Sequence, residues 1–133
     1  MPNDVREGMK RMENETKDCK KLILNVCMSY GSRSEIIHAC QKLTLQYHQQ
    51  NNKNIQEYIN EQSLSNNLLT SSLPDPDILI RTSGEMRLSN FLLWQCAYSE
   101  IFFLDCHWPE ICKKDLIGIL KEYGCKRQRR FGK

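Results

Sequence analysis

The sequence predicts an α/β fold with a mainly parallel central sheet flanked by helices. Short apolar runs, typical of buried strands, alternate along the chain with longer segments whose apolar residues recur at helical spacing. The length of 133 residues, with 40% hydrophobic and 26% charged residues, fits one soluble globular domain that can bury a real core. We therefore expect residues 1–133 to form a single domain.

The chain is predicted to begin with a helix and a strand. Val5, Met9 and Met12 recur at helical spacing, which predicts a helix over residues 3–19. Residues 21–30, KLILNVCMSY, are apolar and partly β-branched, and they end at Gly31. Such a run predicts a buried strand that stops at a turn.

A second helix is predicted after that strand, capped by Ser32 or Ser34 and ending near His48. The polar run at 49–54 breaks it, and residues 55–70 predict two short amphipathic pieces. The residues expected on the inner face of the second helix are Ile36, Ile37, Cys40 and Leu43.

The remaining elements are shorter. The prolines at 74–77, PDPD, predict a turn because each proline restricts the residue before it. Strands are expected at 77–81 and 101–104, and a short apolar helix at 91–98 with Ser89 or Asn90 at its N-cap. An amphipathic helix is expected from Lys113 to about Gln128.

Seven scattered cysteines form no C-x-x-C pair, which disfavours a structural zinc site. We expect reduced thiols that mostly fill the core, in a cytoplasmic or cytosol-facing compartment. No apolar run approaches the roughly 20 residues that span a bilayer, and the polar N-terminus does not resemble a secretory signal.

Residues 80–95, IRTSGEMRLSNFLLWQ, place two arginines and a glutamate at the junction of two predicted buried elements. Ligands of open α/β sheets bind beyond the carboxyl ends of strands, and Arg81 ends one. Gly84 permits a sharp turn, and Arg87 and Ser89 precede a predicted helix start that favours an anion. Because guanidinium groups bind phosphate oxygens in a bidentate way, this combination predicts a phosphate or diphosphate site.

Two observations leave alternatives open. Arg81 and Arg87 can instead form structural ion pairs with Glu85 and Glu100. The basic tail 126–133, KRQRRFGK, is typical of a solvated terminus, but also of an arm that contacts an anion, a membrane surface or a nucleic acid.

Three segments together resemble the cis-prenyltransferases, the undecaprenyl and dehydrodolichyl diphosphate synthases. The central one is ILIRTSGEMRLSNFLLWQCAYSEIFF at 78–103, followed by WPE at 108–110. Upstream, LILNVCMSYGSRSEII at 22–37 is similar to the strand, turn and helix of that family, and Arg130-Phe131-Gly132 matches its closing motif. The resemblance covers nearly the whole chain.

The resemblance implies a Mg²⁺-dependent enzyme that condenses isopentenyl diphosphate with an allylic diphosphate, on the cis-prenyltransferase fold. It implies that Glu100 helps to hold the Mg²⁺ ion. The residues that resemble the family's substrate ligands are Arg81, Arg87, Ser89, Arg130 and Gly132. The supporting residues are Arg33, which is partly structural, Glu85, which orients an arginine, and Asn90, which caps the helix.

One departure concerns the family's N-terminal motif, His-x-x-Met-Asp-Gly-Asn, whose aspartate is catalytic. The motif is missing from these residues, so we assign no catalytic residue and expect a C-terminal portion that is inactive alone. The closing motif beside the clamp favours a homodimer, and the polyprenyl (dolichol-type) product suggests membrane contact, at the cytosolic face of the endoplasmic reticulum. The alternatives are a non-catalytic partner subunit and a nucleic-acid-binding domain, the latter disfavoured by low net charge.

Overall fold

The computed structural model describes residues 2–50 and 54–127. Arg130 and Gly132 lie outside the described residues, as does the predicted helix end at Gln128. The closing motif therefore stays a prediction.

Two strands form a small parallel sheet, β1 (Ile78–Arg81) and β2 (Glu100–Phe103). Their register pairs Ile78 with Glu100 at one end and Arg81 with Phe103 at the other. Both predicted strands are confirmed to within one residue. The α/β class is confirmed as well, with the carboxyl ends of both strands on the same edge.

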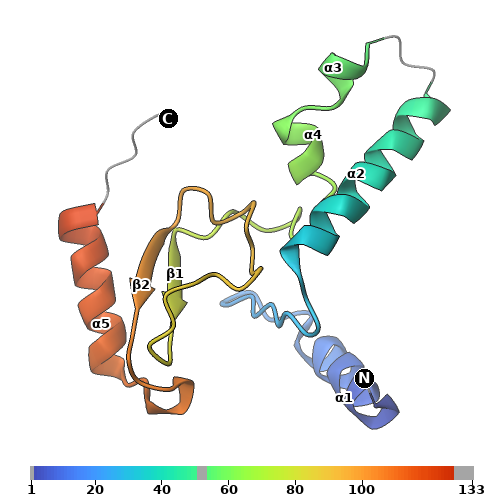
Figure 1. The fold of residues 1–133 in the computed structure, drawn as a ribbon. Helices are drawn as coiled ribbons and strands as arrows, with labels where there is room; N and C mark the ends of the chain where they lie inside the picture. Colours follow the sequence, from blue (N-terminus) through green and yellow to red (C-terminus); the bar gives the residue numbers. More distant parts are fainter. Residues whose placement is uncertain (1, 51–53, 128–133) are drawn as a thin grey trace.

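Helices lie on either side of this sheet (Figure 1). On the β2 side, α5 (Lys113–Glu122) continues into a π-helical segment at Tyr123–Arg127, and a 3₁₀ turn at Trp108–Glu110 precedes it. On the other side, the long α2 (Ser32–Gln49) runs beside the short α4 (Glu61–Ser65), with α3 (Ile55–Tyr58) near its far end. These boundaries confirm the predicted second helix, the two short pieces and the start of the C-terminal helix.

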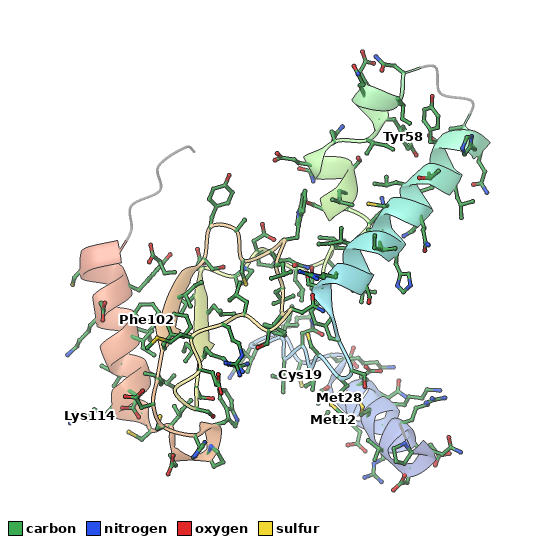
Figure 2. All side chains as sticks on the ribbon, viewed as in Figure 1. Met12, Cys19, Met28, Tyr58, Phe102 and Lys114 are labelled. Atoms are coloured by element: carbon green, nitrogen blue, oxygen red, sulfur yellow. The ribbon has the colours of Figure 1, made fainter. Side chains whose placement is uncertain are left out.

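The first helix, α1 (Asn3–Thr16), confirms the helical spacing of the N-terminal residues but ends three residues before the predicted boundary. None of its residues is buried, and Figure 1 shows it projecting away from the sheet. Its apolar positions Val5 and Met12 are exposed. The buried core lies elsewhere, around Leu43 of α2, Phe102 of β2 (labelled in Figure 2) and Ile119 of α5.

The predicted buried strand at 21–30 is wrong for this structure. Residues 22–28 form neither a strand nor a helix, and their apolar side chains are exposed. A strand exists only where a neighbour completes its hydrogen-bond ladder. The described part of the chain holds one sheet, and it consists of β1 and β2 alone.

The predicted helix at 91–98 is also wrong, because this segment forms successive turns. Asn90, just before the segment, and Leu92, within it, have φ of 63° and 43°, which a right-handed helix excludes. The amide of Cys96 donates to the carbonyl of Leu92 over 2.9 Å, so a single helical turn survives. The predicted turn at 74–77 is an irregular connection without helix or strand.

The buried face of α2 differs from the prediction. Leu43 is buried as expected, but Ile37 and Cys40 are exposed, and the buried positions are Ser32, Glu35, Ala39 and Leu43. Polar residues turn inward here because they find hydrogen-bond partners in the core, described below. The cysteines are free thiols in the described part of the chain, but only Cys96 is buried, so they do not mostly fill the core.

Candidate functional site

Arg81 ends β1, as the sequence predicted, and the parallel register places the carboxyl end of β2 at the same edge of the sheet. Beyond Arg81 the chain turns at Ser83 and Gly84, with φ of 68° and 67°. The amide of Ser83 donates to the carbonyl of Cys106 over 2.9 Å, and the amide of Gly84 to that of Leu104 over 3.0 Å. The loop after β1 is thereby fixed against the chain that follows β2.

Arg81 holds an unusual donor at this edge. Its Nε–H is buried, yet it has no hydrogen-bond partner among the described residues, and no described carboxylate forms an ion pair with Arg81. A buried donor without an acceptor costs about 1–3 kcal/mol. An arrangement of this kind calls for an acceptor that the described residues do not provide.

Arg87 forms an ion pair with Glu85, at the surface. One of the structural ion pairs considered as an alternative to ligand binding is therefore present. The same contact allows Glu85 to orient an arginine. The side chain of Arg87 is 68% exposed, and an exposed pair is worth about 0.2–1 kcal/mol. Because a guanidinium carries further N–H donors, the pair leaves Arg87 able to bind an anion.

Asn90 caps a helix, but α2 rather than the helix predicted at 91–98. Its Oδ1 accepts from the amide of Arg33 over 2.9 Å, and its carbonyl accepts from the amide of Ser32 over 2.8 Å. Ser32 Oγ in turn accepts from the amide of Leu93 over 3.0 Å, so Ser32 does not cap α2. The start of α2 and the loop that carries Ser89 are thus joined by three hydrogen bonds.

Backbone strain is concentrated in the same loop. Positive φ values occur at Ser83, Ser89, Asn90 and Leu92 as well as at Gly84. Left-handed backbone costs a non-glycine residue roughly 1–2 kcal/mol, and such residues cluster at functional sites. Ser89 is exposed, so its hydroxyl is accessible to a ligand.

Sequence reasoning missed Glu35, a buried carboxylate that is 3% exposed. Glu35 accepts from the hydroxyl of Tyr30, from the amide of Leu69 over 2.8 Å and from Nε2 of Gln95 over 3.1 Å. Burial and the bond to Glu35 raise the pKa of Tyr30 to about 12. The pattern Ser-x-x-Glu at 32–35 was a signal for a helix start, but it does not reveal that the carboxylate turns into the core.

Glu100, the residue expected to hold Mg²⁺, lies at the other end of the sheet. It pairs with Ile78 at the amino end of β1, three residues from Arg81 and thus about 10 Å along the strand. No group of three or more acidic, histidine or cysteine side chains that could hold a metal occurs in residues 2–50 and 54–127. The role of Glu100 as a magnesium ligand therefore stays a prediction.

A hollow of about 340 Å³ lies away from the arginines, between residues 25–31 and the side of α2. Tyr30, Glu35, His38 and Leu69 are among its lining residues, and neither Arg81 nor Arg87 lines it.

Over the described residues, no helix is long and apolar enough to cross a membrane.

Comparison with known proteins connects this geometry to a family. The family model of the undecaprenyl diphosphate synthases (Prenyltransf) matches residues 1–132. An isoprenyl transferase of Bacillus cereus is 45% identical over 132 residues, which are 99% of this chain and 50% of that protein. A geranylgeranyl-diphosphate-specific tritrans,polycis-undecaprenyl-diphosphate synthase of Picrophilus torridus is 44% identical over 99% of this chain and 51% of its own length.

Two solved structures share the fold. Lavandulyl diphosphate synthase from Lavandula x intermedia, in complex with dimethylallyl diphosphate, has a TM-score of 0.85 at 28% identity. That similarity covers 95% of this chain and 53% of the enzyme. A probable undecaprenyl diphosphate synthase from Campylobacter jejuni has a TM-score of 0.80 at 37% identity, over 100% of this chain and 58% of that one. The chain spans about half the length of the relatives it matches.

Proposed function

The chain belongs to the undecaprenyl diphosphate synthase family of cis-prenyltransferases, and we propose that it binds the diphosphate group of isopentenyl diphosphate at the carboxyl edge of its sheet. Arg81, Arg87 and Ser89 are the residues of the proposed clamp. In the whole protein this substrate would condense with an allylic diphosphate, extending a polyprenyl chain.

The observation that carries the proposal is the buried, unpartnered Nε–H of Arg81. A diphosphate oxygen is an acceptor of the right charge, and a charge-assisted hydrogen bond contributes about 1.5–3 kcal/mol net. Arg87 would exchange its exposed partner Glu85 for a second oxygen at a cost below about 1 kcal/mol. The balance favours bound diphosphate over the ion pair.

The chemistry assigned to these residues is positioning. Condensation needs the alkene of isopentenyl diphosphate close to the allylic carbon, and a clamp on its diphosphate restricts the alkene to that place. Strained backbone at Ser89 and Asn90, tied to the start of α2, supports a clamp that is organised before the substrate arrives. One solved relative holds dimethylallyl diphosphate, a compound of the allylic class.

Magnesium and a homodimer are part of the proposal. Mg²⁺ is bound in proteins by one or two carboxylates together with substrate phosphates. Glu100 is one such carboxylate, and it begins β2, where it pairs with Ile78 at the amino end of β1. We derive no step through the metal. The proposed homodimer rests on the resemblance of the closing motif, which includes Arg130 and Gly132.

Calorimetry with isopentenyl diphosphate tests the proposal. Arg87→Ala is expected to weaken binding about 10- to 100-fold, the loss of one charge-assisted contact. The matched control is Arg11→Ala, which removes another exposed arginine that is paired with an acidic residue, Glu15 on α1. Equal affinity for the wild type and Arg87→Ala, or no binding by the wild type, contradicts the clamp and favours the alternative of a non-catalytic partner subunit.

A further inference from the structure

The loop that follows β2 is joined to the loop that follows β1 at the carboxyl edge of the sheet. Nδ1 of His107 lies 3.2 Å from the hydroxyl oxygen of Ser83, the second residue after Arg81. Beside this contact, the amide of Ser83 donates to the carbonyl of Cys106 over 2.9 Å. The imidazole of His107 is therefore anchored on the turn that directly follows one arginine of the proposed clamp.

The backbone of His107 is fixed as well. Its amide donates to Oε2 of Glu110 over 2.6 Å, and its carbonyl accepts from the amide of Glu110 over 2.9 Å, at the start of the 3₁₀ turn. The side chain of His107 is exposed, and its Nε2 has no hydrogen-bond partner among the residues that the structure describes. One ring nitrogen is therefore held by Ser83, while the other is open to a ligand.

The contact with Ser83 determines what the open nitrogen can do. A neutral imidazole has one donor and one acceptor nitrogen, and the bond made by one nitrogen sets the role of the other. When the hydroxyl of Ser83 donates to Nδ1, the proton is on Nε2, which becomes a donor. The protonated ring donates from both nitrogens and adds a positive charge. A phosphate oxygen accepts from Nε2 in both states and disfavours the reverse tautomer, in which Nε2 is an acceptor.

His107 is the only side chain of residues 104–112 that can carry a positive charge. The same loop contributes two carboxylates, Asp105 and Glu110, and the carboxylate of Asp105 lies beside Gly84. These carboxylates repel an anion at this edge of the sheet, so a donor or a cation on the same loop is needed to offset them. His107 supplies it from the β2 side, whereas the arginines of the clamp supply it from the β1 side.

We propose that His107 is a further ligand of the diphosphate group, which donates from Nε2 to a phosphate oxygen while Ser83 orients its ring. The proposal rests on the proposed function, because it requires a diphosphate at the edge of the sheet where Arg81 lies. It extends the clamp from the loop after β1 to the loop after β2. The competing role for His107 is to hold the turn at Ser83 without touching the ligand.

Two substitutions separate these roles. His107→Asn keeps a polar atom at the position of Nδ1, and with it the contact to Ser83, but removes the outer nitrogen. His107→Gln instead places an amide N–H near the position of Nε2. Calorimetry with isopentenyl diphosphate is expected to show about 3- to 10-fold weaker binding for His107→Asn, the loss of one hydrogen bond at an exposed site. His107→Gln should bind more tightly than His107→Asn.

His48→Asn is the matched control, since His48 is an exposed histidine in the last turn of α2 and should leave the affinity unchanged. NMR of the imidazole nitrogens in the unaltered chain adds a measurement that does not depend on how a variant folds. The Nε2 signal of His107 should shift during titration with isopentenyl diphosphate, whereas the signals of His38 and His48 should stay in place.

Equal affinity for the wild type and His107→Asn, or a His107 signal that does not shift at saturating ligand, overturns the proposal. If Arg87→Ala weakens binding in the same experiment while His107→Asn does not, the role of His107 is lost and the clamp stands. Absence of binding by the wild type contradicts the clamp itself, and the role of His107 with it.

Discussion

The amide of Arg33 donates to Oδ1 of Asn90 over 2.9 Å, across 57 residues of sequence. The contact joins the first turn of α2 to a loop whose backbone is left-handed at Ser89 and Asn90. Neither partner is satisfied by its own segment. The loop that carries one proposed clamp residue is therefore held by a helix from another part of the chain.

Replacing Asn90 tests this connection. Asn90→Ala removes the cap on α2 and should lower the free energy of unfolding by about 0.5–2 kcal/mol. Asn90→Asp keeps an Oδ acceptor for the amide of Arg33 and should lose less. Urea denaturation of the two variants measures the difference, and equal losses would show that the cap contributes nothing.

The two carboxylates Glu35 and Glu85 should respond very differently to the same substitution. Glu35→Gln places an amide among three donors in a buried site, so it should cost about 1–3 kcal/mol of unfolding free energy. Glu85→Gln alters an exposed ion pair and should cost less than about 1 kcal/mol. Denaturation of both variants at pH 7 provides the comparison; a cost for Glu85→Gln equal to that for Glu35→Gln would refute the buried network.

The raised pKa of Tyr30 predicts how the stability of the fold changes in alkaline solution. Its pKa in the folded chain is raised from 10.0 to about 12, so the folded state holds this proton more tightly than the unfolded state. The contribution of Tyr30 is fully present below pH 10 and is lost as the pH rises to about 12. Tyr30→Phe should remove this part of the pH dependence, whereas Tyr98→Phe, at a largely exposed position, should retain it. Identical pH profiles for the wild type and Tyr30→Phe would exclude the assignment.

The local sequence pattern was sufficient to predict the strands that find a pairing partner in this structure. β1 and β2 were predicted because each is apolar and bounded by breakers, and each finds the other as a partner. Residues 21–30 carry the same local signal but have no described strand beside them. Their apolar pattern suits a buried strand, but in this structure they are not part of a sheet. Periodicity likewise predicted the position of α2 but not which of its faces is buried, because two of the three partners of Glu35 lie 34 and 60 residues away in the sequence.

The candidate site, too, could be predicted from the sequence only in part. That Arg81 ends a strand and that Gly84 forms the turn followed from residue types and spacing. That Glu100 lies at the opposite end of the sheet follows only from the parallel register, which pairs it with Ile78. The roles of the clamp residues came from resemblance, and they remain predictions.

The central claim is that Arg81 lacks an acceptor which a diphosphate supplies. NMR of the arginine Nε–H groups, during titration with isopentenyl diphosphate, tests it most directly, with Arg81→Lys identifying the resonance. We expect the Arg81 Nε–H signal to shift and its solvent exchange to slow by about tenfold or more as the hydrogen bond forms. An Arg81 signal that neither shifts nor gains protection at saturating ligand would contradict the proposed diphosphate site.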